Sequence, residues 1–229
     1  MNITFSQKTR GVHHLWRVLA ITALGLWLVV AGALGVAAAK TGQAKTPVAT
    51  GFMNDMIVHH HQAVDMALMG AVKGSAEIQA TALKIVRGQS LEMGAMQAWL
   101  PRNPTAEPVP MMGWMADRYA GLGQHIPEYD QFISACQARP GQMPGLATLD
   151  ELNRLQQLSA GEFNRLWLRL MIQHHEAATI MIQFARDHAE TSKVRMLAAG
   201  MLRDQVVESA YLRTLALRDG YSSGNANGR

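Results

Sequence analysis

The chain has 229 residues, with 21 Lys and Arg against 17 Asp and Glu, 15 Met, nine His and one Cys. A single Cys excludes an internal disulfide and any cysteine-rich zinc or iron–sulfur site. Lys8, Arg10 and Arg17 lie in an amino-terminal stretch without acids, so the rest of the chain has 18 basic and 17 acidic residues. A net charge of +1 in that remainder gives no reason to expect nucleic-acid binding.

The amino-terminal segment, residues 1–39, predicts export. Residues 18–39 form a run of 22 residues without a charge, and a helix of about 33 Å would cross a bilayer core. Two arginines precede the run, and such basic residues stay on the cytoplasmic side. The run ends in three alanines that resemble a signal-peptidase site, but it is long for a signal and contains Trp27. The sequence therefore favours a retained transmembrane anchor over a cleaved signal, with residues 40–229 on the periplasmic or extracellular side.

Beyond a short polar linker at residues 40–49, the sequence predicts an all-α domain over residues 50–219 and a flexible tail over residues 220–229. Ala, Leu, Met, Gln and Glu are frequent in the domain, and no convincing alternation of apolar and polar residues indicates a strand. Periodicity, capping residues and the positions of Gly and Pro predict four long helices. They are expected at about residues 50–72, 75–100, 159–188 and 192–219.

Two capping boxes mark helix starts in the second half of the chain. Thr148 is followed by Glu151, and Ser159 by Glu162. At this spacing each side chain can bond the backbone amide of the other residue. The first box is expected to open a short helix and the second a long one.

Residues 101–142 separate the two halves of the domain and have the character of an insertion. They are rich in proline up to residue 112, which predicts a loop followed by short helices. Met111, Met112 and Met115 cluster beside Trp114. This cluster is either an exposed capture site for a soft metal or an apolar plug of the loop.

An internal repeat is the main feature of the sequence. Residues 56–66, MIVHHHQAVDM, match residues 171–181, MIQHHEAATIM, at an offset of 115 with six of 11 positions identical. The helix that follows each motif repeats as well, at an offset of 116. Its corresponding polar residues are Gln89 and Gln205, and Glu92 and Glu208. Two copies of one helical hairpin predict a four-helix bundle with pseudo-twofold symmetry.

Helical periodicity places two His of each motif on the apolar face. At 100° per residue, the pair His59 and His60 shares a stripe with the Met residues of its motif, whereas His61 and Asp65 point away. The second motif behaves in the same way, and one Glu of each following helix lies on its inward stripe. Each hairpin thus directs two imidazoles and one carboxylate inward. The candidate metal-site residues are His59, His60, His174, His175, Met56, Met66, Met171, Met181, Glu92 and Glu208.

Buried imidazole and carboxylate groups are costly unless they pair or bind a metal. The pattern favours metal binding, and the alternative is a His–Glu hydrogen-bond network that fixes the register of the bundle. Imidazole with thioether favours copper, Cu(I) especially, whereas imidazole with carboxylate also suits zinc, iron or manganese. The four Met residues are equally compatible with core packing, and Glu92 and Glu208 either complete the ligand set or fix the imidazole tautomers. Because a ligating imidazole must be neutral, metal affinity is expected to fall as the pH drops through about 6.5.

The doubled motif resembles an exported bacterial family known as domain of unknown function 305. The family pattern is Met, two residues, His-His, two residues, Ala, two residues, Met, and both copies have it. The resemblance covers about residues 50–100 and 143–217. The family is similar to ferritin-like bundles and includes copper-binding periplasmic proteins of the CopM type. It therefore implies a ferritin-like bundle, export and copper binding, although Leu146 follows Gly145 where the family often has Met.

The sequence thus predicts an extracytoplasmic metal-binding protein that sequesters or hands over copper through His and Met, and it favours a binding role over an enzyme. One alternative is a ferritin-like di-iron or manganese oxidoreductase, which generally has Glu three residues before His; neither His pair has this Glu. The other is a metal-free structural module. The expected partners are the metal ion, the membrane through the amino-terminal helix, and a metal-handover protein. Nucleic acid is not expected, and the sequence does not indicate the oligomeric state.

Overall fold

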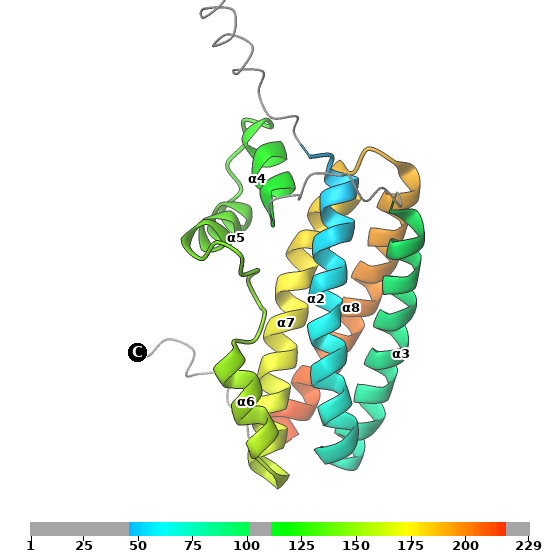
Figure 1. Cartoon of the computed structure of the whole chain (residues 1–229), viewed down its shortest axis with the longest axis vertical. Helices are drawn as coiled ribbons and strands as arrows, with labels where there is room; N and C mark the ends of the chain where they lie inside the picture. Colours follow the sequence, from blue (N-terminus) through cyan, green and yellow to red (C-terminus); the bar gives the residue numbers. More distant parts are fainter. Residues whose placement is uncertain (1–45, 101–110, 219–229) are drawn as a thin grey trace, which may run out of the picture. The chain divides into compact units, whose positions relative to one another are not determined.

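The computed structural model describes residues 46–100 and 111–218. Within these two ranges the secondary structure consists of seven helices and includes no strand, which confirms the predicted all-α class (Figure 1). The four long helices are α2 (Val48–Lys73), α3 (Ala76–Trp99), α7 (Ala160–His188) and α8 (Ser192–Arg218). The three short helices are α4 (Gly113–Ala120), α5 (Pro127–Ala138) and α6 (Leu149–Gln157).

The predicted membrane anchor at residues 18–39 and the predicted tail at residues 220–229 lie outside the described residues. Of the helices that the structure describes, none combines the length and the apolar character needed to cross a membrane. Export and anchoring therefore stay predictions from the sequence.

The long helices form two hairpins, α2 with α3 and α7 with α8, which are the two copies of the sequence repeat (Figure 1). The hairpins meet where α2 packs against α7. All four helices begin and end within two residues of the predicted bounds. Ser75 caps the start of α3, because its Oγ accepts a hydrogen bond from the amide of Ile78 at 3.4 Å, and Gly74 ends α2 as predicted.

The capping-box prediction is confirmed for α6 and wrong for α7. Before α6, the Glu151 amide donates to Thr148 Oγ1 at 3.2 Å, and the Thr148 amide donates to the Glu151 carboxylate at 3.0 Å. Before α7, the side chain of Ser159 accepts no capping hydrogen bond. Ala160, the first residue of α7, has a φ of 49°, in the left-handed region, so the chain enters this helix without the regular geometry of a capping box.

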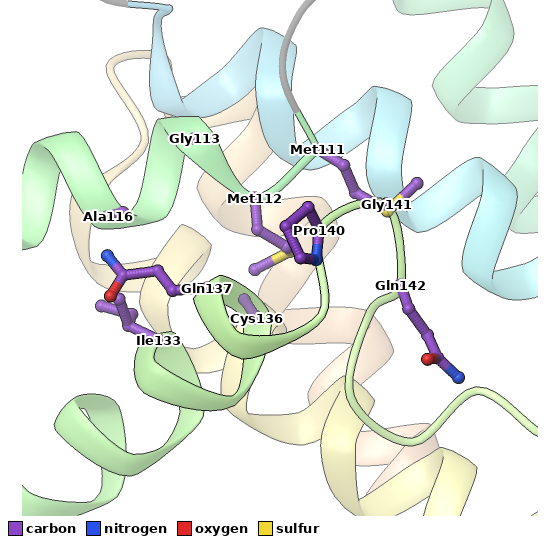
Figure 2. A pocket seen from close by; sticks show the side chains of 10 residues that line it. All are labelled: Met111, Met112, Gly113, Ala116, Ile133, Cys136, Gln137, Pro140, Gly141 and Gln142. Carbon is purple, nitrogen blue, oxygen red and sulfur yellow. The ribbon is translucent and has the colours of Figure 1, made fainter.

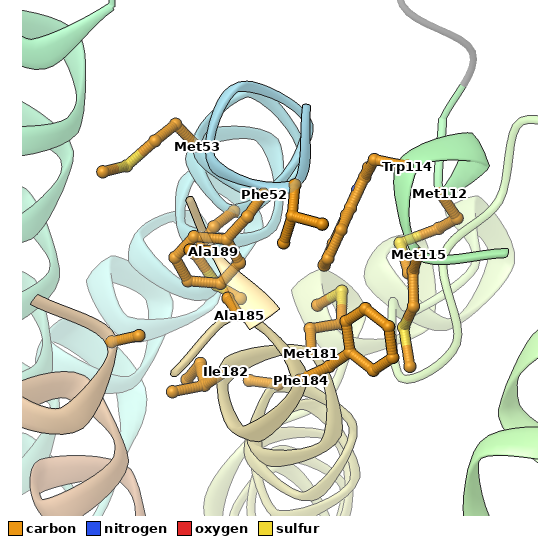
Figure 3. Packing of buried hydrophobic residues seen from close by; sticks show 14 of the residues in the cluster. Phe52, Met53, Met112, Trp114, Met115, Met181, Ile182, Phe184, Ala185 and Ala189 are labelled. Atoms are coloured by element: carbon orange, nitrogen blue, oxygen red, sulfur yellow. The ribbon is translucent and has the colours of Figure 1, made fainter. Parts of the chain in front are cut away.

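The core of the bundle consists of two apolar clusters. The first apolar cluster surrounds Phe52, Trp114 and Phe184, and Figure 3 shows these rings packed between α2, α7 and α4. The second apolar cluster surrounds Phe163 and Trp167 and lies between the two hairpins and α6. Aromatic side chains of this size each bury about 150–250 Å², so burial in these two clusters is the main force that holds the four helices together.

The short helices of the insertion attach to the bundle through the first apolar cluster. Trp114 and Met115 of α4 are fully buried in it. Asp55 of α2 fixes the start of α4, because its carboxylate accepts hydrogen bonds from the Met112 amide at 2.7 Å and from Trp114 Nε1 at 2.8 Å. Met112 and Met115 are 4% and 0% exposed. The prediction of an exposed capture site is therefore wrong for these two, and the apolar plug describes them.

The segment that leads into α6 lies against both hairpins. The Gln62 side chain of α2 donates to the Ala147 carbonyl at 2.9 Å and accepts from the Ala147 amide at 2.7 Å. Gly145 has a φ of 84°, and a Cβ added there would lie 2.3 Å from the Cβ of Ala177 on α7. Only glycine satisfies both the backbone conformation and the close approach to α7 at this position.

Candidate metal centre

All four motif imidazoles lie in the interior, at the level where α2 crosses α7. His59, His60, His174 and His175 are each at most 1% exposed. The two helices run antiparallel, since His59 of α2 faces His174 of α7 and Met66 faces Trp167. Outward-pointing residues of the motifs, namely His61, Asp65 and Glu176, are exposed. The predicted inward orientation of both His pairs is therefore confirmed, and we call these four imidazoles the histidine layer.

The inner pair of the histidine layer is His59 and His174. Their ring centroids are 3.7 Å apart and the rings are tilted by 42°. His174 Nε2 lies 3.1 Å from the His59 carbonyl oxygen. Because a carbonyl only accepts, this nitrogen carries the hydrogen, and Nδ1 of His174 keeps a lone pair. That Nδ1 and both ring nitrogens of His59 are buried without a hydrogen-bond partner.

The outer imidazoles each pair with a carboxylate of the neighbouring helix in the same hairpin. His60 Nε2 lies 2.7 Å from Glu92 Oε2 on α3, and His175 Nε2 lies 2.9 Å from Glu208 Oε2 on α8. His175 Nδ1 also donates to the Met171 carbonyl at 3.0 Å. With one hydrogen on Nδ1, the contact between Nε2 and the carboxylate needs a second proton, on the ring or on Glu208. Nδ1 of His60, in contrast, has no partner.

Burial decides the charge of the inner pair. It lowers the pKa of both His59 and His174 well below 6.5, and the nearby imidazoles His60 and His175 lower these pKa values further. Both inner rings are therefore neutral at pH 7, the form that ligates metals. The loss of metal affinity below about pH 6.5 stays a prediction, and the lowered pKa values of these two residues move the expected proton competition at them to lower pH.

The four candidate Met ligands are buried on either side of the histidine layer. Met56 and Met181 belong to the first apolar cluster, and Met66 and Met171 belong to the second. This arrangement follows from the antiparallel repeat, which brings the start of one motif beside the end of the other. Thioethers and hydrocarbon thus enclose the imidazoles from both directions along the bundle, and the ligand role of the four Met residues stays a prediction.

The donor atoms do not form a ready ligand cage. Within residues 46–100 and 111–218, no group of three or more His, Cys, Asp or Glu side chains is arranged to hold a metal ion. Nevertheless, His59, His60 and His174 each keep a buried ring nitrogen without a hydrogen-bond partner. Neutral imidazole suits copper and zinc, so the donor set fits such an ion, and the rings must turn before they can share one.

Three polar residues beside the layer were assigned no role from the sequence. Gln89 and Gln205 are each 2% exposed and Ser209 is 4% exposed. Both amide atoms of Gln89, Oε1 of Gln205 and Oγ of Ser209 have no hydrogen-bond partner. The signal that identifies the two glutamines is the repeat itself, which places them at equivalent positions one turn before Glu92 and Glu208.

A separate hollow of about 590 Å³ lies beside α4 and α5, away from the histidine layer. Met111, Met112 and Cys136 are among the residues that line it, and the side chains of the two methionines diverge in Figure 2. Burial raises the pKa of the Cys136 thiol to about 11, so the sulfur stays protonated at neutral pH and is a poor metal ligand in this state.

The chain matches the family described as domain of unknown function (DUF305) over residues 49–216. It belongs to this family. None of the curated proteins compared with this DUF305 chain matches it.

Solved structures of DUF305 proteins have the same fold. A presumed secreted DUF305 protein from Streptomyces coelicolor is 27% identical, with a TM-score of 0.63 over 78% of this chain and 98% of its own. A DUF305 fragment from Deinococcus radiodurans is 26% identical, with a TM-score of 0.56 over 77% of this chain and 99% of the fragment. CopM in its Cu(II)-bound form is 23% identical, with a TM-score of 0.53 over 74% of this chain and 96% of its own. The likeness to CopM shows the common fold.

Proposed function

We propose that this DUF305 protein binds a soft or borderline metal ion, copper above all, and that it sequesters or hands over this ion outside the cytoplasm. The supporting observation is the set of three buried imidazoles, His59, His60 and His174, that each keep a ring nitrogen without a partner. A buried polar atom without a partner costs about 1–3 kcal/mol. A metal ion bound at these nitrogens would remove that cost, whereas the apolar clusters on both sides offer no other partner.

Each member of the layer has a distinct role in this proposal. His59 and His174 act as neutral ligands, since burial keeps their pKa values low. The hydrogen bond from His60 Nε2 to Glu92 orients that ring and makes its free Nδ1 a better donor. Both nitrogens of His175 have partners, so His175 becomes a ligand only if its ring gives up the bond to Met171 or to Glu208. The four motif Met residues are candidate thioether ligands that favour Cu(I). Zinc, iron and manganese are weaker candidates, because Glu92 and Glu208 are already engaged with imidazole.

Relatives and the amino-terminal sequence support the choice of metal and compartment. CopM has been crystallised in forms described as Cu(II)-bound, Cu(I)-bound and Ag-bound. The Streptomyces coelicolor relative is described as a presumed secreted protein. We extend copper-type binding and export to this chain, with residues 18–39 as the anchor and residues 40–229 on the outer side of the membrane.

The second candidate is a metal-free structural module. The observation that favours it is the pair of hydrogen bonds from His60 to Glu92 and from His175 to Glu208, at 2.7 and 2.9 Å. These bonds fix α2 against α3 and α7 against α8 in one register, without any ion. The two candidates differ in a measurable property, which is ion binding. A metal-free module would bind no ion at the unpartnered nitrogens of the inner pair.

The test is a metal titration of the full chain, purified without a His tag. Cu(II), Cu(I), Ag(I) and Zn(II) are added to wild type and to three variants, namely His59→Gln/His174→Gln, Glu92→Gln and His61→Gln. His61 is exposed on the same helix and serves as the matched control. We expect the double variant to lose at least about 100-fold in affinity, and Glu92→Gln to lose about 10–100-fold. Equal stoichiometry and affinity in the double variant and wild type would contradict a site in the histidine layer.

A further inference from the structure

A groove between α3 and α8 leads from the surface toward the histidine layer. It has a volume of about 340 Å³. Its lining residues are Gly88, Gln89 and Glu92 of α3 and Asp204, Gln205, Val207 and Glu208 of α8. Gly88, Asp204 and Val207 are exposed, whereas Gln89 and Gln205 are buried. The groove therefore spans the distance from solvent to the interior.

The other approaches to the histidine layer are closed by packing. The two apolar clusters enclose it in both directions along the bundle. Around its circumference, α2 packs closely on α3, α7 on α8, and α2 on α7. In contrast, α3 and α8 pack mainly on their hairpin partners and little on each other. The side between α3 and α8 is thus the open one, and the groove lies there.

The groove is acidic from its mouth to its inner end. Three carboxylates line it, and no Lys, Arg or His is among its lining residues. Burial and the negative charges of Glu92 and Glu208 raise the pKa of Asp204, which places the three groups near one another. Glu92 and Glu208 are in turn hydrogen-bonded to His60 and His175. The acidic lining is therefore continuous with the histidine layer.

Two buried amides inside the groove have no protein partner. Gln89 has neither its Oε1 nor its Nε2 hydrogen-bonded, and Oε1 of Gln205 is likewise unpartnered. Each side chain is 2% exposed and lines the groove from an opposite helix. Amide oxygens coordinate cations directly and accept hydrogen bonds from the water molecules bound to cations. This pair therefore indicates a ligand independently of the carboxylates.

We propose that the groove between α3 and α8 is the port through which a hydrated metal cation enters and leaves the histidine layer. Asp204, with Glu92 and Glu208, concentrates cations at the groove by charge attraction. The amide oxygens of Gln89 and Gln205 then replace part of the water shell on the way to the imidazoles. The role of the port rests on the proposed metal-binding function, but it concerns the rates of binding rather than the final site.

Gly88 offers a way to obstruct the groove without disturbing the site. A Cβ added at Gly88 would meet no atom within 4 Å, and the same holds for Gly94 of the same helix. Gly94 is exposed and does not line the groove. A lysine at position 88 would place a bulky, positively charged side chain at the exposed mouth of the groove, whereas Gly94→Lys changes helix propensity and net charge equally. The two variants therefore form a matched pair.

The experiment measures the rates of Cu(II) binding to the full chain by stopped-flow quenching of tryptophan fluorescence. Release rates are measured with an excess of chelator. We expect Gly88→Lys to slow both rates at least about tenfold and to leave Kd nearly unchanged, while Gly94→Lys matches wild type. Asp204→Asn should slow association about threefold to tenfold at low ionic strength, with the difference lost in high salt. Asp65→Asn, an exposed acid on α2, is its control.

Three outcomes would overturn the port, and they separate it from the metal site. Equal rates in Gly88→Lys and Gly94→Lys, with Cu(II) bound in a way that depends on His59 and His174, would overturn the port alone. A weaker Kd with unchanged association in Gly88→Lys would do the same, because it would indicate a distorted site. Failure of wild type to bind Cu(II), Cu(I) or Ag(I) would overturn the metal site and the port together. Circular dichroism and urea unfolding of both Gly variants verify that they fold alike.

Discussion

The neutral inner imidazoles predict that the metal-free protein loses stability in mild acid. His59 and His174 have pKa values well below 6.5 in the folded chain, because burial and neighbouring imidazoles disfavour their charged forms. In the unfolded chain each takes up a proton near pH 6.5. The unfolded state therefore binds more protons below that pH. Stability is fully present above about 6.5 and decreases as the pH falls from there toward the lowered pKa values.

The magnitude follows from proton linkage. Each imidazole that protonates only on unfolding changes the free energy of unfolding by about 1.4 kcal/mol per pH unit once the pH is well below 6.5. Between about pH 7.5 and pH 5.5 the two groups together should remove roughly 3 kcal/mol. Domains of this size have about 5–15 kcal/mol in total. The loss is therefore large enough to shift the urea midpoint clearly.

The assay is urea unfolding of the full chain in a metal chelator at several pH values, followed by circular dichroism. In His59→Gln/His174→Gln the free energy of unfolding should depend much less on pH, while His61→Gln should keep the slope of wild type. His188, whose pKa is also lowered by burial and by Arg118, is present in all three proteins and cancels in the comparison. A wild-type stability that changes by less than about 1 kcal/mol over this range would refute the reasoning.

Three further substitutions test the packing that positions the site. Gly145→Ala should destabilise the protein by about 2–4 kcal/mol in urea unfolding, because the left-handed φ and the contact with Ala177 both exclude a methyl group; a change under about 0.5 kcal/mol would contradict this. Trp167→Phe should remove about 1–2 kcal/mol, since it deletes the bond from Nε1 to the Met66 carbonyl at 2.7 Å. Thr148→Ala should lower the free energy of unfolding by about 1 kcal/mol and speed amide hydrogen exchange in α6. Unchanged exchange in α6 would contradict the capping role of Thr148.

The helices and their inward faces were predictable because they depend on local rules. Periodicity and stops such as Gly74 act over one or two turns, and the structure follows them closely. The repeat then constrained the site, because a motif used twice at the same register must present the same face twice. The burial of His60 and His175, and their contacts with the Glu of the next helix, follow from this register.

What could not be predicted depends on contacts between distant segments. The 3.7 Å approach of the His59 and His174 rings is set by how α2 crosses α7, and no feature of either helix alone fixes that crossing. Asp55 is an ordinary acidic residue in the sequence, and only the folded chain brings Trp114 to it. The left-handed conformation of Ala160 is likewise imposed from outside, because alanine has no preference for it.

The two copies of the motif are not held equally firmly. In the second copy, His174 donates to the His59 carbonyl and His175 donates to the Met171 carbonyl. In the first copy, both nitrogens of the His59 ring and Nδ1 of His60 lack a partner. Turning a ring of the second copy breaks a hydrogen bond worth about 1 kcal/mol, whereas turning His59 meets only packing. His59 is thus the adjustable imidazole of the layer, because His60 is held by Glu92 and the second copy is held by its carbonyl acceptors. In the proposed metal site, ions of different radius would be accommodated by a turn of the His59 ring on an unchanged backbone.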